Sequence, residues 1–189
     1  LPQLPAARVY HGAAAYTLYG NDNILVVGGN VGGDDWSTST VIWNYGNYRW
    51  DQGQDLLVAR KFPAVASIAV NSTGIGGSTL RNSVVYVVGG VNEQGVLASM
   101  EVYSALSGNW TMGMSVPSPL AATAIGVLPQ PARAAGAWAD GPGRKAAEQK
   151  KRPGPPLALV VVTRISRSVH SPMTNVVVPP APVCTPDSA

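Results

Sequence analysis

The chain is poor in the residues that build most metal and catalytic sites. Its 189 residues include one cysteine, Cys184, and two histidines, His11 and His170. A single cysteine excludes an internal disulfide framework and does not indicate a compartment. Metal sites need ligands that converge from the fold, and only His11 lies outside the C-terminal third. We therefore predict no metal, no other cofactor and no catalytic residue, and we expect His11 to form a hydrogen bond at the start of a strand.

Charge is also scarce, and it is unevenly spread. Only 12% of the residues are charged, with a net charge of +3. Residues 129–189 carry +5 and residues 1–128 carry −2. No apolar run is long enough to cross a membrane, and no signal-peptide pattern is visible. We expect no membrane span, and cytoplasmic and secreted locations both stay open.

What the chain does contain is a repeat, with an Arg, a short apolar run, a diglycine and a Trp in the same order twice. Two of the intervals are almost constant. The second Gly precedes the Trp by 21 positions in one copy and 20 in the other, and the Trp precedes the next Arg position by 10 in both. The interval from the Arg to the first Gly is longer in the second copy, 29 positions against 20. The extra residues fall within residues 71–82, whose Asn, Ser, Thr and Gly predict an inserted loop. Without it, the unit has about fifty residues. The landmarks are Arg8, Gly28, Gly29 and Trp50, then Arg60, Gly89, Gly90 and Trp110.

Each unit contains four short segments rich in Val, Ile, Tyr and Trp and bounded by Gly, Asn or Asp. This composition predicts β-strands, and no stretch predicts a convincing helix. The expected strands are residues 13–18, 24–27, 40–43 and the segment around Trp50, then 64–70, 84–88, 100–103 and the segment around Trp110.

The small residues and the landmarks have structural interpretations. Small side chains in the first strand of a unit suit a crowded axis on which neighbouring units converge. A diglycine permits positive φ and lets a bulky aromatic from the next element lie against bare backbone. We expect Trp50 and Trp110 to cover apolar surface between adjacent sheets, each burial contributing about 2 to 3 kcal/mol.

The order of these landmarks resembles the kelch repeat. The second unit matches best, with NSVVYVVGG, SMEVYSALSGNW and the Val-Tyr pair that ends at Tyr103. The first unit has NILVVGG and VIWNYGNYRW, so Ile42 and Trp43 replace Val-Tyr. A third unit starts near Pro119, but Leu120 occupies the Arg position and no third diglycine follows. The resemblance covers about residues 8–117.

Kelch repeats form the blades of a β-propeller, and this resemblance gives the expected fold class. We predict an all-β, partial kelch-type β-propeller of about two four-stranded antiparallel blades plus one strand. Unit 1 spans about residues 7–58, unit 2 about 59–117 and a truncated unit 3 about 118–128. Two blades cannot close a ring, and the chain starts with Leu1 in place of Met, so we expect a fragment of a larger propeller.

Residues 129–189 form a different kind of segment, rich in Pro, Ala and basic residues. We predict a low-complexity, disordered tail, in which the apolar run 157–163 could pair as a strand. Its basic residues at 144–145 and 150–152 invite a reading as a nuclear-import or nucleic-acid contact. No aromatic platform accompanies them, so solvated charge is the favoured interpretation and no nucleic acid is expected. Sequons at Asn71 and Asn109 would accept a glycan in a secreted protein.

Two functions from different classes remain in view, with a third hypothesis of no independent function. The leading one is a non-catalytic scaffold whose loops, residues 29–39, 71–82 and 91–99, bind a protein partner, further blades of the same or another chain, or a glycan. The alternative is a fragment of a galactose-oxidase-like or sugar-acting propeller enzyme. The acidic pairs Asp34-Asp35 and Asp51 with Asp55 could do acid–base work or hold calcium, although acids in loops more often solvate turns. Trp36 is either a contact anchor or a lid on its own blade. The candidate binding residues are Asp34, Asp35, Trp36, Asn92 and Glu93.

Overall fold

The computed structural model describes residues 2–33, 35–73, 79–128, 159–163 and 175–178, and all regular structure in them is β-strand. No helix in this part of the chain is long and apolar enough to cross a membrane. The predicted all-β class is confirmed.

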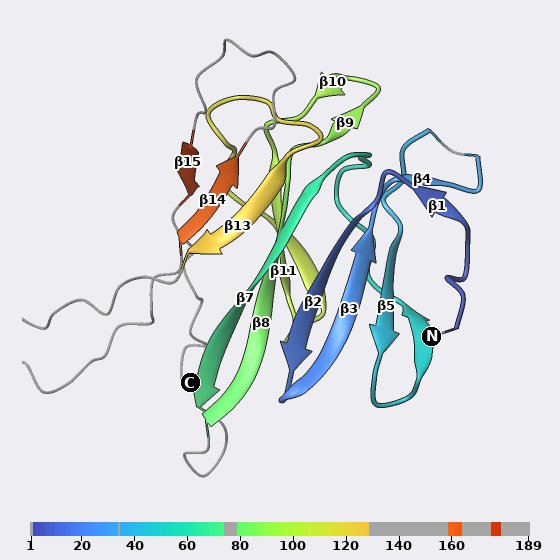
Figure 1. Ribbon diagram of the computed structural model, residues 1–189, viewed down its shortest axis with the longest axis vertical. Helices are drawn as coiled ribbons and strands as arrows, with labels where there is room; N and C mark the ends of the chain where they lie inside the picture. The colour runs from blue at the N-terminus through green and yellow to red at the C-terminus, as the bar shows by residue number, and fades with distance from the viewer. Residues whose placement is uncertain (1, 34, 74–78, 129–158, 164–174, 179–189) are drawn as a thin grey trace, which may run out of the picture.

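Two four-stranded antiparallel sheets correspond to the two sequence units (Figure 1). Each predicted strand is present, and most extend by one to a few residues beyond the predicted bounds. The first sheet has the order β2-β3-β5-β6 and the second the order β7-β8-β11-β12, so each is a meander from an inner to an outer strand. The strands are β2 Gly12–Leu18, β3 Asn21–Val27, β5 Thr40–Asn44 and β6 Arg49–Gln52, then β7 Ala64–Thr73, β8 Thr79–Val88, β11 Met100–Ser104 and β12 Asn109–Met112.

A third sheet is larger than the sequence predicted. Its first strand, β13 Ala124–Leu128, was expected. Strand β14 Leu159–Thr163 lies within the apolar run 157–163 and pairs with β13. A further strand, β15 Asn175–Val178, pairs with β14 and was not predicted. The single expected strand of unit 3 is therefore three strands, because a Val-rich run far along the chain completes the antiparallel ladder. The other residues of the predicted tail lie outside the described residues.

The predicted loop at residues 71–82 is mostly β-ladder. Strands β7 and β8 stay paired from Asn71 opposite Arg81 to Thr73 opposite Thr79. Residues 74–78, which include all three glycines of this stretch, lie outside the described residues. The prediction was wrong because Ser, Thr and Asn were read as loop formers, whereas Thr also suits a strand.

Short strand pairs occupy one end of the sheets, which we call the loop end (Figure 1). There β1 Arg8–Val9 pairs with β4 Asn30–Val31, and β9 Val91–Asn92 pairs with β10 Gly95–Val96. The β2–β3 connection and the adjoining ends of β7 and β8 lie at the opposite end, the turn end. The loops expected to bind a partner, apart from residues 71–82, therefore share one end of the molecule.

The first strands of the three sheets lie side by side. Strand β2 packs against β7, and β7 packs against β13 on its other side (Figure 1). A Cβ atom added to Gly12 of β2 would collide with the Val65 side chain of β7. A small residue is thus needed at Gly12, where the first two sheets converge, whereas Ala13 and Ala15, for which the sequence predicted the same reason, are exposed.

Two apolar clusters fill the spaces between the sheets. The alternation of side chains along β8 divides them, since Val85 and Val87 face the first sheet whereas Tyr86 and Val88 face the third. The cluster between the first and second sheets consists of Tyr16, Leu25, Val27, Leu56, Val85, Val87, Tyr103, Ala105 and Trp110. The cluster between the second and third sheets consists of Ile68, Tyr86, Val88, Met100, Val102, Val116 and Leu120, with Ile125 and Val127 packed against it.

Candidate partner-binding surface

Each diglycine joins its own unit to the next one through the backbone. The N–H of Gly29 donates to the carbonyl of Arg60 at 2.8 Å, and the N–H of Gly90 donates to the carbonyl of Leu120 at 2.7 Å. A Cβ on Gly28 would lie 2.5 Å from the Arg60 oxygen. We expected an aromatic ring against these glycines, and this was wrong. A carbonyl group of the next unit approaches instead, which requires bare backbone even more strictly.

Arg60 sits at this joint in a fully buried ion pair. Its Nη2 donates to Oε1 of Glu101 at 2.6 Å, with both side chains 0% exposed. Its Nη1 donates to the Gly89 carbonyl at 2.7 Å, and Glu101 also accepts the N–H of Leu57 at 2.6 Å and of Val58 at 3.1 Å. Burial lowers the pKa of Arg60, while the negative charge of Glu101 opposes that shift. The pair thus ties the segment between the units to the second sheet.

Arg8 holds the same position in unit 1 without a carboxylate partner. It donates to the Gly28 carbonyl and the Ser39 hydroxyl, as Arg60 does to Gly89 and Ser99. The residue in the register of Glu101 is Val41, and the Nε of Arg8 is buried with no partner. Pro5, which has no N–H to donate, stands in the register of Leu57. The two units therefore share the Arg landmark but not its ion pair.

The two landmark tryptophans differ in how they are covered. Trp110 is 4% exposed, packs between the first two sheets and donates from its indole nitrogen to the Gln54 carbonyl at 2.8 Å. This confirms the predicted covering role. Trp50 is only half-buried, and its indole nitrogen donates to the carbonyl of Pro2 at 3.2 Å. The N-terminal segment takes the place on unit 1 that residues 53–58 take on unit 2.

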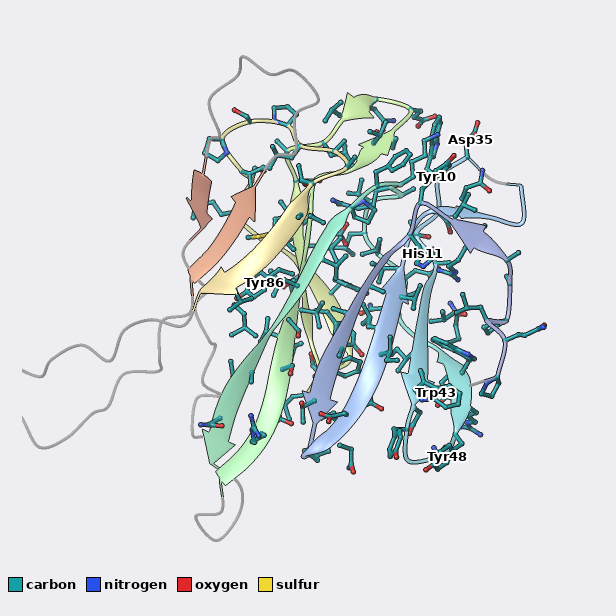
Figure 2. The ribbon with its side chains drawn as sticks, viewed as in Figure 1. Tyr10, His11, Asp35, Trp43, Tyr48 and Tyr86 are labelled. Atoms are coloured by element: carbon teal, nitrogen blue, oxygen red, sulfur yellow. The ribbon has the colours of Figure 1, made fainter. Side chains whose placement is uncertain are left out.

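At the loop end, Trp36 reaches across to the neighbouring unit. The Nζ of Lys61 lies 5.0 Å from the centroid of the Trp36 ring, and the indole is half-buried. Such a cation–π contact contributes about 0.5 to 1 kcal/mol when it is exposed. The partner of Trp36 in this contact belongs to unit 2 and not to its own blade, and a role as a contact anchor stays a prediction. Its neighbour Asp35 is exposed (Figure 2), and Asp34 lies outside the described residues.

The second loop presents one of its two candidate residues. Asn92 is 8% exposed, and its Oδ1 accepts the N–H of Gln94 at 3.0 Å, so it shapes the β9–β10 turn. Glu93 is exposed and accepts a hydrogen bond from the Gln94 side chain at 2.6 Å. Glu93 can therefore offer a carboxylate to a partner, whereas Asn92 supports the loop.

An aromatic pair that the sequence did not single out lies at the same end. The rings of Tyr10 and Phe62 are 4.3 Å apart, and Tyr10 is 53% exposed. Both residues have left-handed backbone, with φ of 60° and 56°, as does Ala122 with 51°. The N–H of Phe62 donates to the Tyr10 carbonyl at 2.8 Å, and that of Ala122 to the Phe62 carbonyl at 3.2 Å. Each residue follows its Arg position by two, a spacing that could have revealed the series.

The remaining polar candidates do not converge. Among the described residues, no group of three His, Cys, Asp or Glu side chains could hold a metal ion. Asp51 pairs with Arg49 at 2.6 Å, and Asp55 accepts hydrogen bonds from Gln52 and from the N–H of Thr40. His11 is exposed as a whole residue. Its pKa is lowered, first because its ring is partly shielded from water and second because the positive charge of Arg8 lies nearby. His170 and Cys184 lie outside the described residues.

Comparison with known families agrees with the sheet architecture. Residues 77–117 match the family model described as the Kelch motif. The matched segment contains β8, β11 and β12, which are three of the four strands of the second sheet. No curated protein matches the chain. The kelch resemblance is confirmed for this unit, and the sheets have the arrangement of a partial kelch-type propeller.

Proposed function

We propose that the chain is part of a larger kelch-type propeller and that its loop end is a non-catalytic docking surface for a protein partner. The observation that carries this proposal is that loops from two units are locked together there. Trp36 of unit 1 contacts Lys61 of unit 2, and the ring of Tyr10 lies tilted against the ring of Phe62. Kelch repeats typically serve as protein-interaction scaffolds, and loops on a rigid scaffold are where binding usually resides.

The composition of the loop end suits a protein partner. Tyr10 offers an exposed ring on a fixed base, and Asp35 and Glu93 offer carboxylates at the rim. Aromatic rings surrounded by charged rim residues are typical of protein interfaces. A glycan is the alternative partner, since exposed rings also stack on sugars.

The open face of the first sheet supports the proposal of further units. In the second sheet, Val85 and Val87 face the first sheet and are 0% exposed. In the first sheet the residue in the register of Val85 is Ile24, which is only half-buried, and Ala13 and Ala15 on the neighbouring strand are exposed. Val26 and Trp43 on the same face are 4% and 2% exposed, so this face is open only in part. A further unit packed there would cover this apolar face, as the first sheet covers the second.

Substitution at the two ends tests the docking proposal. The 189-residue chain is immobilised, and partners captured from cell extract are compared with those of a Trp36→Ala, Glu93→Lys double variant. A variant at the turn end, Arg81→Ala, serves as the matched control because Arg81 is exposed. We expect the loop-end variant to lose the partner and the control to keep it. Equal capture by both variants would contradict the proposal.

The enzyme alternative makes a separate demand. An oxidase of the galactose-oxidase type needs a copper site, and the residues that hold the copper would have to come from further blades. Copper content and hydrogen peroxide production from sugar alcohols, measured on the full-length propeller, decide this question directly. Peroxide production above that of a copper-free control would replace the scaffold proposal.

A further inference from the structure

The hydrogen bonds of the two diglycines run in one direction along the chain. Unit 1 donates to unit 2, because the N–H of Gly29 reaches the carbonyl of Arg60, and unit 2 donates to unit 3, because the N–H of Gly90 reaches the carbonyl of Leu120. Along these bonds each unit donates to its successor and accepts from its predecessor. In the part of the chain that the structure describes, no sheet lies on the predecessor side of unit 1, which we call the free face.

A second set of bonds, at the turn end, runs the same way. The N–H of Thr17 donates to the hydroxyl of Ser83 at 2.9 Å, and the N–H of Tyr19 donates to Oδ1 of Asn82 at 2.9 Å. The donors belong to the β2–β3 hairpin of unit 1 and the acceptors to β8 of unit 2. With the carbonyl of Arg60, unit 2 therefore holds unit 1 through acceptors at both ends of its sheet.

Unit 1 carries the same acceptors at the corresponding positions. The Arg landmark supplies the carbonyl of Arg8 at the loop end. Counted back from the diglycines, the positions of Asn82 and Ser83 are held on β3 by Asn21 and Asp22, which are both exposed. Oδ1 of Asp22 accepts a hydrogen bond within its own hairpin, and its carboxylate has a second oxygen to offer. The free face thus repeats the acceptors with which unit 2 holds a neighbouring sheet.

The apolar part of the free face corresponds to that of unit 2 as well. Val85 is 0% exposed in the cluster between the first two sheets, and Val65 packs against that cluster. Their positions in unit 1 are held by Ile24, which is half-buried, and Ala13, which is exposed. The apolar residues that unit 1 covers in unit 2 therefore have counterparts in unit 1 that lack this cover.

The segment before Arg8 indicates where a covering sheet would come from. In unit 2, the carbonyl of Gln54 accepts the indole N–H of Trp110, and Gln54 belongs to the connector that leaves the outer strand β6 of unit 1. In unit 1, the carbonyl of Pro2 accepts the indole N–H of Trp50 in the same way. The N-terminal segment therefore lies on unit 1 as a connector from the outer strand of a preceding sheet lies on unit 2.

We propose that the free face of unit 1 is the seat of one further kelch-type sheet of the same polypeptide, which precedes unit 1 and ends its second strand in a diglycine. This inference rests on the proposed function and specifies the neighbouring unit. The diglycine N–H donates to the Arg8 carbonyl, and N–H groups of the first hairpin donate to Asn21 and Asp22.

A second copy of the chain does not meet this requirement. Units 1 and 2 of that copy already use their diglycines within the copy, so its unit 3 would have to donate. The residues that follow β14, where the other units have two glycines, are Arg164 and Ile165. At the first of these positions in unit 1, a Cβ on Gly28 would lie 2.5 Å from the carbonyl of the next unit.

The test adds a sheet to the full chain in the natural register. Leu1 precedes Arg8 by seven positions, as Gly53 precedes Arg60, so a copy of residues 1–52 joined in front of Leu1 reproduces the spacing of a joint. The free face is probed by Ala15→Cys, placed only in the original unit 1, because Ala15 is exposed there.

The measurement is the rate of maleimide labelling at position 15, in a Cys184→Ser background. We expect this rate to fall about tenfold or more in the tandem chain relative to the 189-residue chain, because the added sheet buries the position. Ser107→Cys, at an exposed position of unit 2, is the control and should label equally fast in both chains.

Variants of the added copy separate the need for glycine from simple coverage. Gly28→Ala with Gly29→Ala in the copy should restore fast labelling, whereas Gly32→Ala, where a Cβ meets nothing within 4 Å, should keep it slow. Slow labelling with the alanine pair would overturn the diglycine requirement but not the larger propeller. Fast labelling with every copy would contradict both. Sedimentation of the 189-residue chain should show a monomer, and a dimer in which position 15 labels slowly would show that a second copy covers the face.

Discussion

Single residues at the joint decide how firmly adjacent units are held. Glu101, which is 0% exposed, receives Arg60 and two backbone N–H groups, so it satisfies three donors at once. A buried ion pair contributes little net stability when it is compared with a hydrophobic replacement, but removing one partner is costly. Here the backbone donors make even the hydrophobic replacement unfavourable, because Leu57 and Val58 would remain unsatisfied.

Glu101→Gln is expected to lower the free energy of unfolding by about 3 to 5 kcal/mol, since it leaves the Arg60 charge buried without a counter-charge. Chemical denaturation measures this loss. Glu93→Gln, at an exposed position, is the control and should change stability by less than about 0.5 kcal/mol. The double variant Arg60→Leu, Glu101→Leu should stay at least about 2 kcal/mol below the parent. Full recovery in that variant would show that the N–H donors do not matter.

Tyr48→Gly is expected to stabilise the chain slightly, by about 0.5 kcal/mol. Relief of left-handed strain favours the variant, while the greater entropy of unfolded glycine and the lost contact with Trp43 oppose it. Thermal unfolding of parent and variant gives the difference. A fall of more than about 1 kcal/mol would mean that the ring supports the fold through burial.

The diglycine is the element on which the stacking of units depends. It ends β3 and β8, and its second N–H donates to the residue that begins the next unit. The requirement has two parts, a positive φ and an absence of side chain facing the neighbouring carbonyl. The structure offers a pair of glycines that separates the two. Gly28 has a φ of 61° and a carbonyl 2.5 Å from its would-be Cβ, whereas Gly32 has a φ of 64° and nothing within 4 Å.

Gly32→Ala should therefore lower the free energy of unfolding by about 1 kcal/mol, because only the left-handed backbone conformation opposes the side chain there. Gly28→Ala should cost about 3 kcal/mol or more, because the joint between the units must also open. Urea denaturation of both variants gives the comparison. Similar losses at the two positions would show that conformation, and not the close approach of Arg60, explains the landmark.

The sequence predicted the first two sheets well because the repeat supplied each of their four strands twice. What it could not supply was the partner of each element. A diglycine predicts a close approach by another group, but an aromatic ring and a backbone carbonyl would both require glycine there, so the sequence cannot tell which group approaches. Left-handed backbone at Tyr10, Phe62 and Tyr48 was missed because none of these residue types favours it. The extended β7–β8 ladder was read as a loop, since Thr and Ser occur in both.

At the scale of the whole molecule, three sheets enclose two cores, and polar groups within those cores make stability depend on pH. Tyr16 and Tyr103 meet edge to face at 5.9 Å between the first two sheets. Burial raises the pKa of both phenols above their usual value near 10. In the unfolded chain they would ionise at that usual value, so the unfolded state loses protons first as the pH rises.

The chain should therefore be equally stable, as far as these phenols are concerned, at all pH values below about 10 and lose stability above it. Each phenol contributes a slope of up to about 1.4 kcal/mol per pH unit. Thermal unfolding from pH 8 to 11 measures the slope. Tyr16→Phe should reduce it, while Tyr19→Phe, at an exposed ring, should leave it unchanged. An identical slope in Tyr16→Phe would contradict this account.

The hydrogen bond that closes each diglycine comes from a residue of the next sequence unit. The boundaries of the sequence repeat therefore differ from the boundaries of a unit that could fold by itself. A piece cut after residue 58 would lose the Arg60 carbonyl that closes Gly29. Evolutionary duplication, or an engineer grafting one blade into another protein, would need to move a segment that runs about three residues past the apparent border. Permuted chains opened inside a sheet would then tolerate the cut better than chains opened between repeats.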